Sequence, residues 1–317
     1  MISFIIQQLR ILIKDKATWI LLYLVSLFFG LLVGVPFYLT AETIGGNSME
    51  LDRLVSNFDF STFFDFTRKA GKSFRPQYMA TAALGFMYFL LNIFFAGGVV
   101  DRAEHLKEKF SFSRFMSSSA RTFPRYLGAY VLMLLVSICI FFASGIIYFV
   151  ATLLADSGND RSLILWLSIP TIILVVSLSF MLTVQDYTKV LLYKYEHLGI
   201  GTAFSKAFGF VFKNPKTLLN LWILIAFAMI LFAVYLGLDY LIGMTGIATI
   251  ILFFIIQQVV SFIRIFLRFS HLRVAAQYLH LKPINIPPPK VIEFLDEIDE
   301  DLQSDEDIDL EDEKLED

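Results

Sequence analysis

The chain has 317 residues, of which 57% are hydrophobic and 17% are charged, and its formal net charge is −3. A soluble domain usually carries about 25% charged residues, so this composition is unusual for a soluble globular protein. We expect no nucleic-acid partner.

Six stretches lack any charged residue and are long enough to cross a bilayer, which takes about 20 apolar residues. They are Ala17–Leu39, Met79–Val100, Tyr126–Ala155, Ser162–Gln185, Thr217–Leu238 and Tyr240–Ile263. Buried helices of a large soluble protein are the alternative, but such helices nearly always carry a polar stripe. A spanning strand needs only about 10 residues of alternating polarity. The sequence therefore predicts an all-α polytopic membrane protein.

Residues 2–16 precede the first span and form an amphipathic pattern, with isoleucine and leucine on one helical face. This pattern is typical of a helix lying in the membrane interface. The apolar run that follows is too long for the core of a signal peptide, so we expect it to be retained. Cys139, the lone cysteine, cannot form an internal disulfide.

The distribution of Lys and Arg predicts the orientation, because these residues accumulate on the cytoplasmic side. If the N-terminus is inside, the inner segments carry 20 of the 26 basic residues and the outer loops carry six. We therefore expect both termini to be cytoplasmic, in a bacterial inner membrane.

An internal repeat organises the chain. Glu104-His105-Leu106 recurs 92 residues later as Glu196-His197-Leu198, and Phe112-Ser113-Arg114 recurs at the same interval as Phe204-Ser205-Lys206. A fainter third copy ends at His280-Leu281. Such a pattern indicates one structural unit used several times.

The repeat predicts three units, at about 1–106, 107–198 and 199–281. Each consists of an amphipathic interfacial elbow helix and a helical hairpin, and Pro124 and Pro215 open the third and fifth spans. Since every unit enters and leaves on the same side, the three hairpins should be parallel and related by an axis along the membrane normal.

Residues 40–78 form the one long outer loop, which is rich in phenylalanine. Ser61 can begin a short helix there by capping its first turn. A surface helix with its phenylalanines in the outer interface is one interpretation. A lid or a docking surface for a protein partner is the other, since loops of this length are often functional.

Residues 282–290 form a proline-rich linker, and residues 291–317 hold 15 of the 29 acidic residues against one lysine. Such blocks of like charge are usually disordered. Within this acidic cytoplasmic tail, residues 291–302 carry an apolar stripe that could bind a protein partner. The tail could also compete with anionic lipid headgroups for the basic inner face, or simply be solvated.

Polar residues gather at the predicted inner ends of the fourth and sixth spans. This inner-leaflet cluster comprises Gln185, Asp186, Lys189, Arg264 and Arg268. Ionisable residues at membrane depth are candidates for a functional site. A structural ion pair with long side chains reaching the interface is the simpler interpretation.

Three histidines recur with the repeat: His105, His197 and His280. Three imidazoles around a common axis could hold a zinc ion. Placement at helix C-termini, where a positive charge is favourable, explains them more simply. We therefore predict no metal, no cofactor and no catalytic residue, because no known catalytic or nucleotide-binding motif is present.

The segment Gly98-x-x-Asp101-Arg102, the two elbow motifs, and Pro124 and Pro215 carry a resemblance. Residues 1–281 resemble uncharacterised bacterial six-helix membrane proteins. They are also similar to the membrane domain fused to some glycerophosphodiester phosphodiesterases. The chain has no phosphodiesterase domain, so the resemblance implies a membrane-embedded accessory or scaffolding unit and not that activity.

These observations predict a non-enzymatic inner-membrane protein that acts as a lipid- or protein-binding scaffold. A small secondary transporter, or a transporter subunit, is the alternative. A transporter needs polar groups at the membrane midplane, and polar residues are few there.

The orientation can be tested by cysteine labelling in intact cells. Cysteines introduced at Asn47 and Ser157 should react with a membrane-impermeant thiol reagent, because both positions fall in predicted outer loops. A cysteine at Ser304 should not react. Labelling of Ser304→Cys from outside would reverse the predicted orientation.

Overall fold

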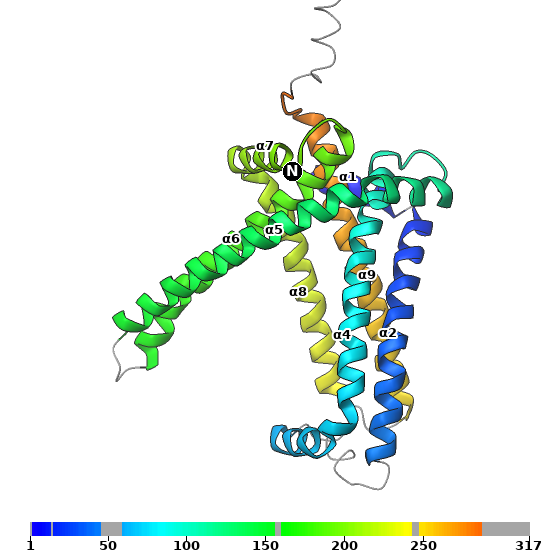
Figure 1. The fold of residues 1–317 in the computed structure, drawn as a ribbon, viewed down its shortest axis with the longest axis vertical. Helices are drawn as coiled ribbons and strands as arrows, with labels where there is room; N and C mark the ends of the chain where they lie inside the picture. Colours follow the sequence, from blue (N-terminus) through cyan, green and yellow to red (C-terminus); the bar gives the residue numbers. More distant parts are fainter. Residues whose placement is uncertain (1, 14, 46–58, 156–159, 243–246, 287–317) are drawn as a thin grey trace, which may run out of the picture. The chain divides into compact units, whose positions relative to one another are not determined.

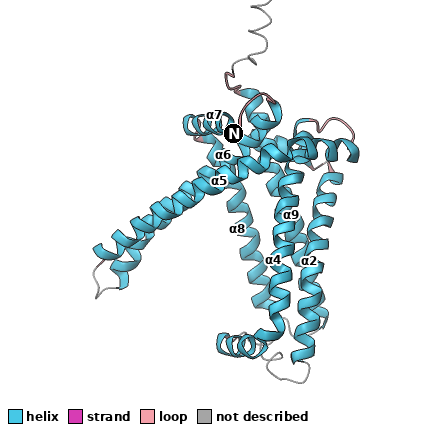
Figure 2. Ribbon diagram, in the orientation of Figure 1, coloured by secondary structure: helices cyan, strands magenta, loops and turns pink. Residues whose placement is uncertain are grey.

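The computed structural model describes residues 2–13, 15–45, 59–155, 160–242 and 247–286 (Figures 1 and 2). Within these residues the chain is helical and contains no strand. The helices are α1 (Ile2–Leu12), α2 (Lys16–Gly45), α4 (Phe60–Glu104), α5 (Phe112–Leu154), α6 (Asp160–Lys194), α7 (Ile200–Lys213), α8 (Lys216–Ile242) and α9 (Ile247–Leu281).

The chain divides into two units, Met1–Leu281 and Lys282–Asp317. In the second unit the described residues, 282–286, form no regular secondary structure, and the acidic tail lies outside the described residues. The helices and contacts below all belong to the first unit.

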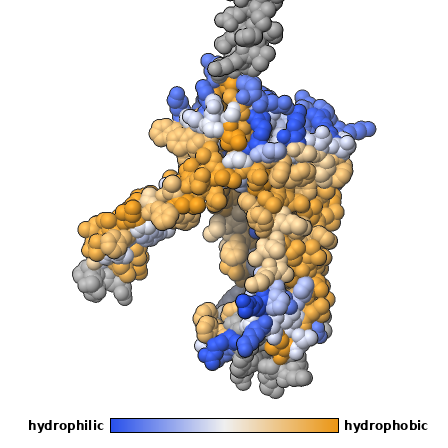
Figure 3. All heavy atoms as spheres, viewed as in Figure 1, coloured by the Kyte–Doolittle hydropathy of each residue, from blue (hydrophilic) through white to orange (hydrophobic). Residues whose placement is uncertain are grey.

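Six of the helices (α2, α4, α5, α6, α8 and α9) are long and apolar enough to cross a membrane. Large apolar side chains remain exposed along them, among them Phe142, Ile146 and Met229. Figure 3 shows apolar residues covering these helices, with hydrophilic residues at the end where α1 and α7 lie and at the opposite end, around the start of α4. An apolar surface of this extent is typical of contact with lipid. The prediction of an all-helical chain is confirmed for the described residues, and six of their helices could span a membrane, as a multi-pass membrane protein requires.

The boundaries differ from the predictions at three places. Helix α5 runs unbroken through Pro124, so the first predicted elbow is the start of this helix and not a separate helix. Helix α4 begins at Phe60. The residue that caps it is Asp59 and not Ser61, because the Asp59 side chain accepts a hydrogen bond from the backbone N–H of Ser61 in the first turn. Hydrogen bonds from the Thr62 hydroxyl and the Ser61 amide lower the pKa of Asp59. Tyr240 belongs to α8 and not to the sixth span.

The residues of the second predicted elbow lie in a separate helix, α7, and its interfacial position stays a prediction. Helix α7 is separated from α8 at Asn214, where the Asn214 backbone N–H donates to the last carbonyls of α7. It buries Ala203, Ala207 and Val211 and leaves Phe208 and Phe212 exposed. The exposed phenylalanines suit a helix lying in the membrane interface.

The tightest packing lies at one end of the spans, which we call the basic end because it carries Arg102, Arg125, Lys189, Arg264 and Arg268. Buried residues concentrate in the last turns of α4, α6 and α9, including Val100, Leu192 and Val274, each at most 1% exposed. Elsewhere the spans bury little of their surface within the protein. The basic end is therefore where the fold can hold side chains in fixed positions.

Helices α4, α6 and α9 contact one another in pairs at the basic end. The Tyr193 hydroxyl of α6 donates to Asp101 of α4, 92 residues away, at 2.5 Å. His280 of α9 lies 2.5 Å from Glu104 and 3.5 Å from Lys194. These are the helices that end the three predicted repeats. The pairing suits parallel repeats around a common axis, and the repeat organisation itself stays a prediction.

Two glycines allow α4 and α5 to approach closely. A Cβ atom on Gly97 would lie 3.0 Å from the Ser118 carbonyl oxygen and 3.1 Å from Ser119 Cα, both of which are backbone atoms. Beside it, the Gly98 amide donates to the Ser119 hydroxyl at 3.1 Å. The glycines therefore fix the distance between the two helices.

Gly97→Ala should destabilise the protein by about 1–3 kcal/mol, because overpacking of this size forces backbone shifts. Gly85→Ala is the matched control in the same helix, since nothing lies within 4 Å of the added Cβ. It should be neutral or stabilising, because alanine favours helix over glycine. Unfolding in detergent measures both variants, and equal stabilities would contradict the close α4–α5 contact.

Candidate functional site

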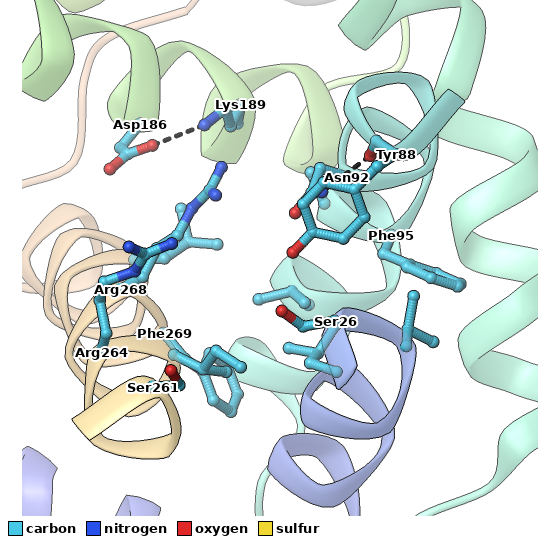
Figure 4. Close-up of a pocket in the computed structure, with 16 residues that line it drawn as sticks. Ser26, Tyr88, Asn92, Phe95, Asp186, Lys189, Ser261, Arg264, Arg268 and Phe269 are labelled. Atoms are coloured by element: carbon cyan, nitrogen blue, oxygen red, sulfur yellow. Dashed lines mark hydrogen bonds and ion pairs between the residues drawn. The ribbon is translucent and has the colours of Figure 1, made fainter. Parts of the chain in front are cut away.

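A cavity of about 200 Å³ lies at the basic end between α2, α4, α6 and α9 (Figure 4). Charged residues come from α6 and α9, whereas α2 and α4 contribute mostly apolar side chains. The lining comprises Leu22, Val25, Ser26, Tyr88, Asn92, Phe95, Ala96, Val99, Asp186, Lys189, Ser261, Arg264, Ile265, Arg268, Phe269 and Leu272.

Asp186 is the one acidic residue of the lining, and both of its oxygens have partners. Lys189 donates to Oδ1 at 2.7 Å from the next turn of α6, and His271 Nδ1 of α9 lies 2.8 Å from Oδ2. The ammonium group of Lys189 also lies 5.1 Å from the centre of the Tyr130 ring, a cation–π contact. Asp186 therefore joins α6 to α9 and balances the charge of Lys189.

The positive charges of Arg264 and Arg268 are not balanced by a carboxylate in this way. Neither guanidinium makes a hydrogen bond or ion pair with any other residue that the structure describes. Figure 4 shows both side chains extending from α9 across the cavity toward Asp186 and Lys189. The charge of Arg268 is close enough to act unfavourably on the Lys189 ammonium. The cavity thus holds an excess of two positive charges beside a neutral Asp186–Lys189 pair.

This arrangement can bind an anion. Guanidinium groups bind carboxylates and phosphates through paired hydrogen bonds, and such bonds to ionised groups are about twice as strong as neutral ones. Arg264 and Arg268 are one helical turn apart, so their side chains project from the same face of α9. Both can therefore reach a single ligand.

An apolar groove of about 480 Å³ adjoins the cavity along α2 and α9. The two share Ser26 and Ser261 as lining residues. The groove continues past Leu27, Gly30 and Gly34 of α2 and Phe254 of α9, away from the basic end. A site with cations at one end and an apolar channel leading from it matches an amphiphilic anion.

The structure brings together most of the predicted inner-leaflet cluster. Asp186, Lys189, Arg264 and Arg268 all line the cavity, whereas Gln185 does not. The predicted structural ion pair forms between Asp186 and Lys189. Arg264 and Arg268 form no ion pair with any residue that the structure describes.

Sequence reasoning missed His271, which was not among the predicted site residues. Arg264, Arg268 and His271 follow the spacing i, i+4, i+7 and therefore share one helical face. Helix α4 shows the same spacing in its cavity-lining residues Tyr88, Asn92, Phe95 and Val99. These periodicities were the available signal for the cavity.

The three repeated histidines do not converge. His105 lies against Asp101 of its own helix, with its Nδ1 3.0 Å from the Asp101 carbonyl oxygen. His197 contacts the ring of Tyr195, and His280 pairs with Glu104. Among the described residues, no group of three or more His, Cys, Asp or Glu side chains could hold a metal ion.

The polar residues farther along the spans have partners in neighbouring helices. Tyr23 of α2 donates to Gln258 of α9 at 3.0 Å, and Gln257 donates to Tyr235 of α8 at 2.8 Å. Asn92 differs, since it donates to the Tyr88 carbonyl within α4. Gln257 and Gln258 therefore hold helices together.

Comparison with known protein families, with curated proteins and with solved structures finds no match. What the structure itself shows is a helical chain with six helices that could span a membrane and a cavity lined by cationic residues at one end of them.

Asp186→Asn should lower the free energy of unfolding by about 3 kcal/mol, because it leaves Lys189 buried without its counter-charge. Glu196→Gln is the matched control, since Glu196 pairs with Arg121 where both side chains are more than half exposed. An exposed pair contributes at most about 1 kcal/mol. Unfolding in detergent separates the two, and equal losses would mean that Asp186 does not secure α6 to α9.

Proposed function

We propose that this chain is a non-enzymatic membrane protein that binds an anionic lipid at the basic end of its spans. The observation that carries the proposal is the pair of guanidinium groups, Arg264 and Arg268, that face the cavity without a counter-charge. The headgroup would lie between α6 and α9, and an acyl chain would follow the groove along α2.

Energetics support this proposal over a purely structural role for the two arginines. A charged side chain at membrane depth costs about 2.5–3.5 kcal/mol on insertion scales, and neighbouring protein groups usually compensate for it. Asp186 is already neutralised by Lys189, and His271 contacts its other oxygen. A bound anion supplies the missing compensation.

The proposal includes the orientation and the setting. The basic end would face the cytoplasm of a bacterial cell, because most Lys and Arg residues fall there. Anionic lipids of the inner leaflet attract each basic residue near the surface by about 1 kcal/mol. Such lipids would be concentrated where the cavity opens.

A secondary transporter remains the alternative, but the described residues give it less support. Polar groups lining a transport path need to be free to bind the solute at mid-membrane. Gln257 and Gln258 are engaged between helices, and Asn92 bonds its own helix. A scaffold that carries a lipid requires no such path.

Replacing both arginines, in an Arg264→Gln/Arg268→Gln variant, should weaken the retention of anionic lipid by the purified protein by about a hundredfold. The loss follows from removing charge-assisted hydrogen bonds, each worth about 1.5–3 kcal/mol. Quantitative lipid extraction and native mass spectrometry of the purified protein measure it.

Lys213→Gln/Lys216→Gln is the matched control, since it removes the same charge at the basic end from exposed residues outside the cavity. This variant should retain lipid as the parent does. An equal loss in both variants would show general attraction to the basic surface, and the cavity would then not be the binding site.

A further inference from the structure

We infer that the lipid held by this cavity carries a terminal phosphate monoester, such as a phosphatidate headgroup, and not a phosphodiester or a zwitterionic headgroup. This inference rests on the proposed lipid binding and adds the class of ligand. It follows from the charges that face the cavity and from their existing partners.

Zwitterionic headgroups are disfavoured because no carboxylate is free to receive their amine. Asp186 is the one acidic residue of the lining, and Lys189 and His271 occupy its two oxygens at 2.7 and 2.8 Å. An ammonium group entering the cavity would meet Arg264, Arg268 and Lys189 instead. Like charges held this close repel each other.

The charge excess selects between the remaining anions. A phosphodiester carries one negative charge, whereas a phosphate monoester carries about −1.5 to −2 at pH 7 and presents three unesterified oxygens. Two guanidinium forks supply enough donors for all three oxygens. The monoester therefore compensates both arginines, and a diester leaves about one positive charge unbalanced.

The size of the cavity favours the same ligand. Its volume of about 200 Å³ is below the usual 300–1,000 Å³ of a site that encloses a whole ligand. A bare phosphate needs little room, and its single ester oxygen can lead into the adjoining groove.

The test compares phosphatidate with phosphatidylmethanol of identical acyl chains. The methyl ester removes one charge and one unesterified oxygen from the phosphate while adding only one carbon. Each lipid is added to the delipidated full-length protein in nanodiscs or micelles of a zwitterionic lipid, and bound lipid is measured by native mass spectrometry. We expect about tenfold tighter retention of phosphatidate, because one additional charge-assisted bond is formed.

The arginine variants assign this preference to the cavity. Arg264→Gln/Arg268→Gln should retain the two lipids equally and weakly, whereas Lys213→Gln/Lys216→Gln should keep the full preference. Inorganic phosphate should compete poorly, because it makes no contact with the groove. Full displacement by inorganic phosphate would indicate a site for soluble phosphate and overturn the inference.

The remaining outcomes separate this inference from the proposed function. If the parent retains both lipids equally and the arginine variant loses both, the preference for a monoester is wrong and anionic lipid binding stands. If the parent retains neither lipid more than the arginine variant does, both proposals fail.

Discussion

The carbonyl groups at the ends of α4 and α6, and in the turns that follow them, need hydrogen-bond donors, and arginine side chains supply them. Arg102 donates to the carbonyls of His105 and Glu108, and Arg125 donates to those of Leu192, Tyr195 and Leu198. Arg273 of α9 donates to Ala103. A helix end that packs against other helices loses access to water, so its last carbonyls must be satisfied within the protein. This requirement holds the basic end together.

The same interactions show which cations are structural. Arg102 also forms a bidentate pair with Asp15, whose carboxylate accepts from Thr18 at the start of α2. Arg273 reaches Gln8 of α1, which ties the first helix to the last. Arg102, Arg125 and Arg273 are therefore fully engaged in joining helices. Arg264 and Arg268 differ because they point into a cavity and contact no acceptor among the described residues.

Much of the fold could be predicted from the sequence because a bilayer imposes a simple rule on length and charge. Six uncharged stretches correspond to six helices, although a proline such as Pro124 did not end a helix that neighbouring helices support. The site was predictable only in part. Asp186, Lys189, Arg264 and Arg268 were identified by their charge, but which of them pair depends on how α6 and α9 pack. His271 lacked a repeat partner and was missed for that reason.

The packing of α6 against α9 also decides what the cavity can bind. If Asp186 were free, it would neutralise one arginine and the cavity would suit a monoanion or a zwitterion. His271 and Lys189 occupy it instead. Snorkelling can relieve a lone arginine by carrying its charge to the interface. Here the two guanidinium groups extend toward the ammonium of Lys189 (Figure 4), where like charges gather. An arrangement of three cations and one carboxylate leaves positive charge without compensation, and this imbalance is the reason that we propose a lipid phosphate as the ligand.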